Sequence, residues 1–387
     1  MVPATVVPLP ELTKRFLVRT FRPALTACLI AVTAIAAAPA LDQALLLDNA
    51  WLEYDGVFNS AHRGGAFEVP ENTLFGYRES MLRGADQLET DVAITKDGQV
   101  VVIHDTSVNR TTDFASLDGN DGVEGYVADL TLAEVKALDA AFCFEPGGYR
   151  DCEVPLATDT YPYRGVRTGE VAPPAGYDAS WFAVPTLTEV LDTFPGVPLN
   201  VEIKATGNVQ IDQRAAALVS AVLTAADRTN DVVVVSFDDG IVAGFKLANP
   251  DINTAPGLGQ GAAFVATSQG PGAGIPEFAG LHRVLQLPVA TLGITVVTED
   301  LVRDAHADNL AVHVFTIDQA DDMVALVRMG VDSIMTNRVE LLEQTLGALA
   351  YQTPAELIPA CPAPSSDALD GGCNLIAFAP GTFSSPK

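Results

Sequence analysis

Short apolar runs that alternate with helical segments restrict most strongly how this chain can fold. The runs are rich in valine, isoleucine and leucine, as strands buried on both faces are. Strands separated by helices pair in parallel, and a chain of 387 residues has room for eight such units in one barrel. We therefore predict an α/β fold with a closed eight-stranded barrel. The expected strands are 57–61, 87–94, 99–103, 199–203, 232–237, 253–258, 283–287, 312–317 and 331–336. The expected helices are 70–84, 131–139, 186–193, 211–226, 239–248, 298–307, 320–329 and 339–349.

Nine strand candidates compete for eight positions in such a barrel. Lys96, Asp97 and Gly98 form a turn signal between two of the candidates, so we expect a hairpin and the extra strand there. Two helix starts also carry recognisable signals. Asn72 is the expected N-cap of helix 70–84, and Thr131 with Glu134 three residues later forms a capping box.

A long loop insertion is predicted at 140–184. The segment is rich in glycine, proline and tyrosine and lacks a helical period, which is typical of a functional loop or an insertion. Its aromatic side chains either line a substrate mouth or pack the insertion against the barrel. These aromatic residues are Tyr161, Tyr163, Tyr177 and Trp181.

The chain ends differ from the barrel region in composition. Four basic residues precede an apolar stretch at 24–37, and Ala38-Pro39-Ala40 fits a small-residue cleavage site. We predict a secretory signal peptide at 1–40 and export to the periplasm or the medium, with an uncleaved N-terminal anchor as the alternative. The barrel is expected at 41–349, followed by a C-terminal extension at 350–387.

Four cysteines follow the predicted signal peptide, in two close pairs. An even number of cysteines in an exported chain indicates disulfide bonds. Three connectivities are possible, and the spacing leads us to expect local pairing. The expected pairs are Cys143 with Cys152 and Cys361 with Cys373.

The charge balance restricts the partners. With 22 basic and 49 acidic residues, the formal net charge is −27. Nucleic acids and anionic lipid surfaces both require a basic patch, so we expect no nucleic-acid partner and no stable membrane association after signal cleavage. A small-molecule partner remains, and the sequence indicates no particular oligomeric state.

Acidic residues cluster at the ends of two predicted strands. Glu89 and Asp91 are two residues apart on one strand, so both face the same side, and Glu202 ends a later strand. Buried like charges are costly unless a cation holds them. Three carboxylates in a barrel mouth therefore predict a site for a hard divalent cation, Ca²⁺ or Mg²⁺.

Two histidines and two basic residues stand at the same kind of strand end. His62 and His104 could act as general base and general acid, because imidazole titrates near neutral pH. Arg63 offers bidentate hydrogen bonds to a phosphate, and Lys204 offers a point charge. The sequence does not decide which histidine is the base.

The order of these motifs resembles the glycerophosphodiester phosphodiesterase family. The resemblance covers about residues 57–349 and rests on HRGG, PENT, ETDVAITKDGQVVVIHD and NRTTD, with VEIK later. It implies a TIM-type (β/α)8 barrel and a metal-dependent hydrolase that cleaves glycerophosphodiesters to sn-glycerol 3-phosphate and an alcohol. The family's catalytic histidines match His62 and His104.

The resemblance also assigns the remaining site residues. The family's metal-binding acids match Glu89, Asp91 and Glu202, and its phosphate-contacting basic residues match Arg63 and Lys204. Glu71 and Asn72, in PENT, match a motif that borders the substrate site.

Two departures from the family pattern concern the strand ends near the C-terminus. Phe315 stands where the family usually has tryptophan, and Asn337 stands where it usually has an acid. We expect both to lie away from the ionic core and to shape the pocket for the alcohol. Two other functions stay open: a phospholipase D-like enzyme acting on lysophospholipids or sphingomyelin, and a non-catalytic phosphodiester-binding protein.

Overall fold

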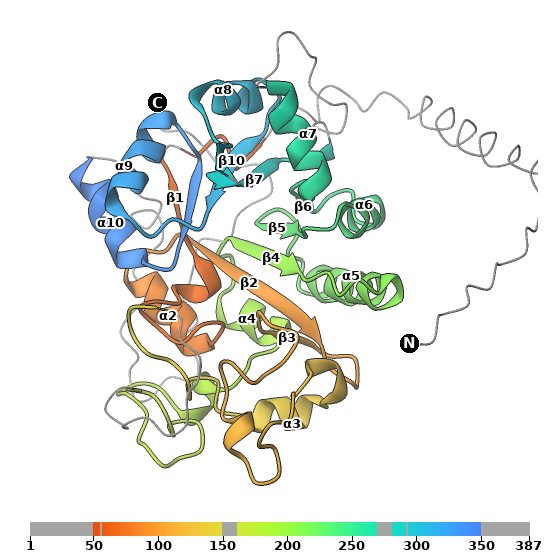
Figure 1. Cartoon of the computed structure of the whole chain (residues 1–387), viewed down its shortest axis with the longest axis vertical. Coiled ribbons are helices and arrows are strands. Elements are labelled where there is room, and N and C mark those ends of the chain that lie inside the picture. Colours follow the sequence, from red (N-terminus) through yellow and green to blue (C-terminus); the bar gives the residue numbers. More distant parts are fainter. Residues whose placement is uncertain (1–48, 55, 149–160, 269–280, 292, 350–387) are drawn as a thin grey trace, which may run out of the picture. The chain divides into compact units, whose positions relative to one another are not determined.

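The computed structural model describes residues 49–54, 56–148, 161–268, 281–291 and 293–349. Within these residues, eight parallel strands form a nearly closed barrel surrounded by helices (Figure 1), as predicted. The hydrogen-bonded order is β6-β5-β4-β2-β1-β11-β10-β7. Between the end strands β6 and β7, the Arg283 N–H donates to the Thr254 carbonyl over 3.3 Å. The barrel strands are β1 (Phe58–Ala61), β2 (Gln87–Ile94), β4 (Leu199–Ile203), β5 (Val232–Val235), β6 (Asn253–Thr254), β7 (Val284–Pro288), β10 (Ala311–Phe315) and β11 (Ser333–Thr336).

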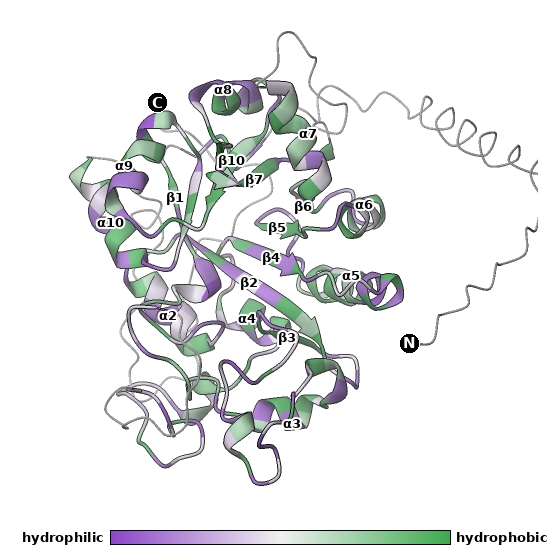
Figure 2. Ribbon diagram, viewed as in Figure 1, coloured by the Kyte–Doolittle hydropathy of each residue, from purple (hydrophilic) through white to green (hydrophobic). Residues whose placement is uncertain are grey.

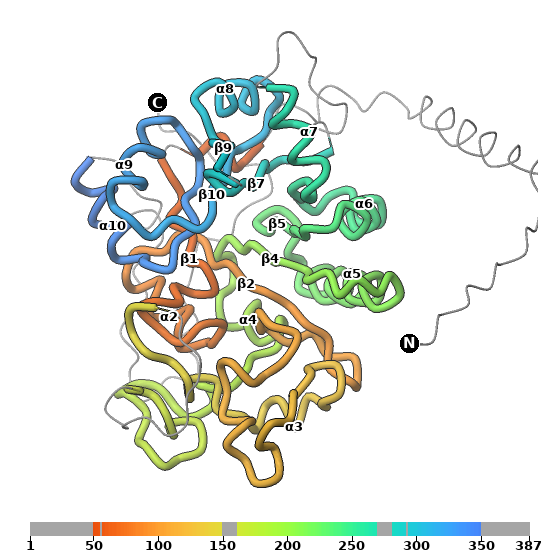
Figure 3. The backbone as a smooth tube through the Cα atoms, viewed as in Figure 1, coloured from red at the N-terminus to blue at the C-terminus, as the bar shows by residue number. Residues whose placement is uncertain are grey.

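The extra strand lies at the predicted hairpin. β3 (Val100–Val102) pairs antiparallel with β2, and the chain reverses direction at Gly98, whose φ is 81°. Figure 3 shows the chain running out along β2 and back through β3. Because β3 is antiparallel, the chain returns to the barrel at the end of β3, and the Ile103 N–H donates to the Asp91 carbonyl over 2.9 Å. His104, which we expected at the end of a barrel strand, therefore reaches the mouth from this hairpin.

All eight predicted helices are present, with bounds that shift by a few residues. With α7, which was not among the eight, the α-helices of the described residues are α2 (Leu74–Leu82), α3 (Leu132–Ala137), α4 (Leu187–Thr193), α5 (Val209–Ala225), α6 (Asp239–Ala248), α7 (Leu258–Ser268), α8 (Glu299–Ala307), α9 (Ala320–Met329) and α10 (Val339–Ala348). The capping box of Thr131 with Glu134 is confirmed at the start of α3. Helix α7 and the small hairpin of β8 (Ala290–Thr291) and β9 (Ile294–Thr295) were not predicted.

The predicted cap of α2 was wrong. The N-cap is Thr73, whose hydroxyl accepts the Gly76 N–H over 2.9 Å. Asn72 has a φ of 53°, a left-handed conformation that an N-cap residue does not adopt. The Asn72 side chain points instead to partners in the site described below.

Apolar side chains fill the spaces between the strands and the surrounding helices. Leu88, Leu199 and Val232 belong to one such cluster with side chains of α4, α5 and α6. A separate cluster joins Trp51 and Phe58 with apolar side chains of β5, β7 and β10. Figure 2 shows β2 and β4 in hydrophilic colour over part of their length, whereas β5 is mainly hydrophobic. The polar part of the barrel therefore lies on the β2–β4 side.

The described part of the insertion packs its aromatic residues against α2. Phe75 of α2 has its ring centroid 4.8 Å from those of both Tyr163 and Tyr177. Trp181 packs against Tyr177, with ring centroids 5.2 Å apart. Tyr161 is buried and lies under the Arg164 guanidinium. These contacts favour the packing interpretation over a substrate mouth.

Several predictions fall on parts of the chain that the structure does not describe. The signal peptide at 1–40, the extension at 350–387 and the cysteines Cys152, Cys361 and Cys373 lie outside the described residues. Cys143 is described and buried, but its expected partner is not, so both disulfide pairs stay predictions. Of the helices described, none combines the length and apolar character needed to cross a membrane.

Candidate active site

Three carboxylates from two neighbouring strands meet in the barrel mouth. Glu89 and Asp91 belong to β2, and Asp91 is in register with Glu202 on β4. One oxygen atom of each residue lies within 4.8 Å of those of the other two. Glu89 and Asp91 are buried, and Glu202 is partly buried. The structure thus brings together the three residues that were predicted to hold a cation.

The electrostatics of this cluster fit a divalent cation. Burial and the charges of Asp91 and Glu202 raise the pKa of Glu89 well above its ordinary value. Burial would also raise the pKa of Asp91, but nearby positive groups, Lys204 foremost, lower it. Lys204 Nζ lies 2.8 Å from both Asp91 Oδ1 and Glu202 Oε1. Lys204 and Arg63 offset part of the negative charge of the three acids, and an ion bound by oxygen ligands would relieve the remaining repulsion.

The chain turns sharply where β1 ends, which places His62 and Arg63. Arg63 has a φ of 52°, and its backbone N–H donates to Glu89 Oε2 over 2.7 Å. The turn requires glycine at position 64, because a Cβ there would lie 2.8 Å from the Tyr77 ring. The Arg63 guanidinium lies 3.6 Å from Asp91 Oδ2. The HRGG motif therefore ties the end of β1 to the acids of β2.

His62 contacts Asn337, and this corrects one expectation. His62 Nδ1 lies 2.7 Å from Asn337 Oδ1, so Asn337 belongs to the ionic core rather than lying away from it. The reason is that β1 pairs in parallel with β11, with Ala61 opposite Thr336, so both strands end beside each other. Burial, followed by the Arg63 charge, lowers the pKa of His62 to about 4. His62 is therefore neutral at physiological pH.

His104 begins a chain of charged contacts. Its Nδ1 lies 2.6 Å from Asp105 Oδ1, and Asp105 Oδ2 accepts a hydrogen bond from Arg110 Nε over 2.5 Å. Arg110 also donates two hydrogen bonds to Glu71, over 2.7 and 2.8 Å. Burial would raise the pKa of Asp105, but the hydrogen bonds from His104 and Arg110 hold it below its usual range. Asp105 is therefore ionised beside the His104 ring.

The two residues of the PENT motif contact residues of the ionic core. Glu71 pairs with two arginines, because Glu71 Oε1 lies 3.6 Å from Arg63 Nη1 and 2.7 Å from Arg110 Nη2. Asn72 donates to Asp91 Oδ2 over 3.1 Å and accepts from the Tyr77 hydroxyl over 2.7 Å. Both side chains thus contact residues of the ionic core, and their predicted contact with substrate stays a prediction.

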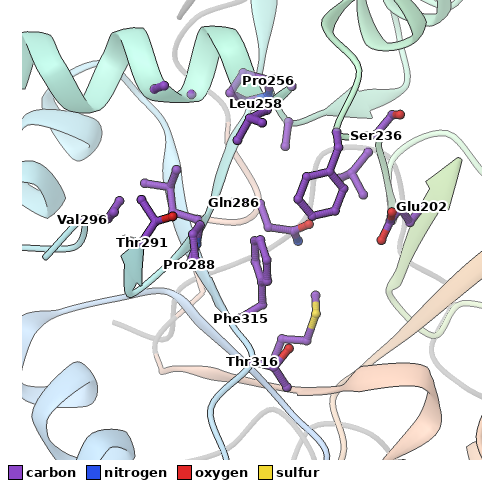
Figure 4. A pocket seen from close by; sticks show the side chains of 18 of the residues that line it. Glu202, Ser236, Pro256, Leu258, Gln286, Pro288, Thr291, Val296, Phe315 and Thr316 are labelled. Carbon is purple, nitrogen blue, oxygen red and sulfur yellow. The ribbon is translucent and has the colours of Figure 1, made fainter. Parts of the chain in front are cut away.

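A cavity of about 540 Å³ joins the ionic residues to an apolar region. His62, Arg63, Glu89, His104, Glu202 and Lys204 line one part of it. The other part is lined mainly by apolar side chains, among them Phe237, Leu258, Val265, Leu287, Ile294 and Phe315. Figure 4 shows Glu202 on one side, Thr291 and Val296 on the other, and Phe315 between them. Phe315 thus lines the pocket, as expected.

Sequence reasoning missed two residues that hold the histidines in place. Arg110 belongs to the NRTTD motif, but nothing in that motif indicates its bond to a glutamate 39 positions earlier. Asp318 accepts the side-chain and backbone N–H groups of Asn337, each over 2.8 Å. The sequence does offer one signal for this pair, because Asp318 and Asn337 each follow directly after one of two predicted neighbouring strands.

Comparisons with known proteins identify the family of this chain. The family model described as "Glycerophosphoryl diester phosphodiesterase family" matches residues 62–341. A glycerophosphodiester phosphodiesterase from Caldanaerobacter subterraneus is 29% identical over 73% of this chain and 94% of its own. A rat lysophospholipase D is 34% identical over 40% of this chain and 38% of its own. A solved structure from Silicibacter pomeroyi, assigned to the same type of phosphodiesterase, has a TM-score of 0.60 and 25% identity, covering 79% of this chain and 98% of that one.

The family match spans every residue of the site named above, from His62 to Asn337. Barrel, motif order and matched region all lead to the same assignment: the chain belongs to the glycerophosphoryl diester phosphodiesterase family.

Proposed function

We propose that this chain hydrolyses glycerophosphodiesters to sn-glycerol 3-phosphate and an alcohol with the help of one divalent cation. One observation carries the proposal: the two histidines line the same part of one cavity as Glu89 and Glu202, two members of the carboxylate cluster. Family membership supports the same reaction.

Glu89, Asp91 and Glu202 would hold the cation, either Ca²⁺ or Mg²⁺, since all their donors are oxygens. Such an ion, when bound, supplies Lewis-acid stabilisation of charge on the phosphate oxygens. Arg63 and Lys204 line the same part of the cavity and offset further negative charge there. A substrate phosphate would compete with Asp91 and Glu202 for the Lys204 ammonium.

The partners of the two histidines suggest different roles. His62 faces an amide and is neutral, so it can accept the proton of the nucleophile, which is either water or the neighbouring glycerol hydroxyl. His104 Nδ1 contacts the Asp105 carboxylate, which orients the ring, and His104 lines the ionic part of the cavity, where it can give a proton to the leaving oxygen. We therefore assign His62 as the base and His104 as the acid.

The test is release of glycerol 3-phosphate from glycerophosphocholine. Release should stop with EDTA and return with excess Ca²⁺ or Mg²⁺. His62→Ala and His104→Ala should each lower the rate by about 10² or more. His306→Ala is the matched control, because His306 lies in α8 and contacts Asp332. No release from folded protein under any condition would overturn the proposal, and a loss of tenfold or less in either variant would overturn that histidine's role.

The apolar part of the cavity favours one second candidate, hydrolysis of lysophospholipids. Leu258 and Ile294 line the cavity yet remain 65% and 60% exposed, so they form an apolar rim. An acyl chain next to the scissile phosphate would cover such a rim. The net charge of −27 favours a zwitterionic lipid over an anionic one. Choline release from lysophosphatidylcholine that increases with acyl length would support this candidate. Choline release from glycerophosphocholine without any release from lysophosphatidylcholine would exclude it.

A further inference from the structure

We propose that Asn337 and Asp318 together lock the neutral His62 ring in the tautomer whose proton is on Nδ1. This inference rests on the proposed function, because it concerns the base of the proposed reaction. It makes Asn337 a positioning residue that acts through His62 rather than on the substrate.

The direction of the Asn337 amide follows from its contact with Asp318. Asp318 Oδ2 lies 2.8 Å from Asn337 Nδ2, and Asp318 Oδ1 lies 2.8 Å from the Asn337 backbone nitrogen. A carboxylate only accepts hydrogen bonds, so the amide must turn its nitrogen to Asp318. Its oxygen then faces His62 Nδ1, at 2.7 Å.

The tautomer of His62 follows from the direction of that amide. An amide oxygen only accepts hydrogen bonds, so His62 Nδ1 must carry the proton at this distance. In a neutral ring, the lone pair is then on Nε2. A proton acceptor needs this lone pair, and the His62 ring lines the cavity.

The residues around Asn337 and Asp318 hold both side chains in these orientations. Asn337 is 2% exposed, so water does not compete for its amide. The Thr336 hydroxyl also donates to Asp318 Oδ1, over 3.1 Å, and fixes the carboxylate. The backbone N–H of Phe67 donates to the Asn337 carbonyl over 3.2 Å, which holds the residue to the turn after β1.

An amide and an acid at position 337 would affect the protonation of His62 differently. A carboxylate in the same place would attract a proton and favour the imidazolium, which cannot accept another proton. The amide fixes the ring without adding a charge. Asn337 thus orients the His62 ring as a buried acid would, and it leaves the ring neutral, so that His62 can act as a base.

The test is nitrogen NMR of the histidine rings in the full chain labelled with ¹⁵N-histidine, measured without substrate. The chain has five histidines, so the His62 signals can be assigned by their loss in His62→Gln. We expect the Nδ1–H pattern for His62 near neutral pH in the unmodified protein. Asn337→Leu should give a mixture of tautomers, and kcat should fall by about 10–10²-fold with KM within about twofold.

Asp318→Asn is the second variant and keeps Asn337 in place. It removes the obligate acceptor, so the Asn337 amide can turn over and the Nδ1–H pattern should become mixed. His306→Gln is the control, and it should remove one set of signals without changing those of His62.

An Nε2–H or imidazolium pattern for His62 in the unmodified protein would overturn the proposal. An unchanged Nδ1–H pattern in the folded variants would overturn it as well. If Asn337→Leu does not fold, the same comparison with Asp318→Asn decides. Since the tautomer is read without turnover, these outcomes are separate from the identity of the substrate.

Discussion

Replacing Glu89 by glutamine should stabilise the metal-free protein while it weakens metal binding. Glu89 is buried among like charges, and its pKa is raised first by burial and then by Asp91 and Glu202. The amide has the same shape and keeps an oxygen that can accept the Arg63 N–H. The substitution therefore removes a charge with little change in packing.

The expected magnitude follows from the distances. Two unit charges within 4.8 Å repel each other by at least about 3.5 kcal/mol at an effective dielectric constant of about 20. Glu89 has two such neighbours, Asp91 and Glu202, and Lys204 and Arg63 offset a large part of this repulsion. We expect the free energy of unfolding of metal-free Glu89→Gln to exceed that of the original chain by about 1–3 kcal/mol near pH 8.

The difference should depend on pH with a definite sign. The pKa of Glu89 is raised in the folded state, so above the ordinary pKa of 4.5 the folded chain holds this proton more tightly than the unfolded chain does. The free energy of unfolding of the original chain therefore falls as pH rises above 4.5. The advantage of the variant should therefore increase between about pH 5 and pH 8. Taking the difference between the two proteins cancels the contributions of the histidines.

The assay is denaturant unfolding in EDTA and again with excess Ca²⁺ or Mg²⁺. The ion should stabilise the original chain, and its effect on Glu89→Gln should be smaller by about 1.4 kcal/mol or more, equivalent to tenfold weaker binding. Glu124→Gln, at an exposed loop position, is the matched control and should change neither quantity. A metal-free variant that is less stable than the original chain, or an undiminished effect of the ion, would refute the reasoning.

Four further predictions test other parts of the molecule. Asp105→Asn removes the carboxylate beside His104, so kcat should fall by about 10–10²-fold with KM within about twofold; an unchanged kcat would exclude the role of Asp105. The rate of the original chain should give a bell-shaped pH profile whose acid limb lies below 6.5, because the pKa of His62 is lowered to about 4 by burial; a monotonic profile would contradict two-histidine catalysis. His313 is buried and its pKa is lowered to about 3, so the fold loses stability as pH falls below 6.5. Denaturant unfolding at neutral pH and at about pH 4.5 should show that His313→Leu reduces this loss of stability by about 2–3 kcal/mol. An equal loss in the variant and the original chain would contradict the prediction. If lysophospholipids are substrates, Leu258→Asp should lower their turnover about tenfold and change that of glycerophosphocholine less than twofold; equal losses would argue against an acyl site.

The sequence predicts the barrel because the signals for it are local. Apolar runs of strand length and the capping box at Thr131 depend on neighbouring residues, and the structure reproduces both. Helix α7 lacks such signals, since Gly259 and Gly261 weaken its helical pattern. The cap at Asn72 failed because a distant partner, Asp91, decides where that side chain points.

The acidic cluster could be predicted for a similar reason. Glu89 and Asp91 must share a face by strand geometry alone, and Glu202 ends another strand. The position of Asn337 could not be predicted in this way, because it depends on β1 and β11 closing the barrel side by side. The Arg110–Glu71 pair joins two loops 39 residues apart, and no local rule links them.

The hairpin of β2 and β3 has a consequence for how such a site can vary. His62 follows a strand of the barrel itself, whereas His104 is carried by a strand that folds back from outside it. Adding two residues to each arm of the hairpin would lengthen it without turning any side chain to the opposite face, because strand side chains repeat every two residues. A change of a single residue in one arm would turn His104 away from the cavity. This corner of the site can therefore tolerate insertions and deletions in steps of two residues per arm, while the other histidine is fixed by the barrel.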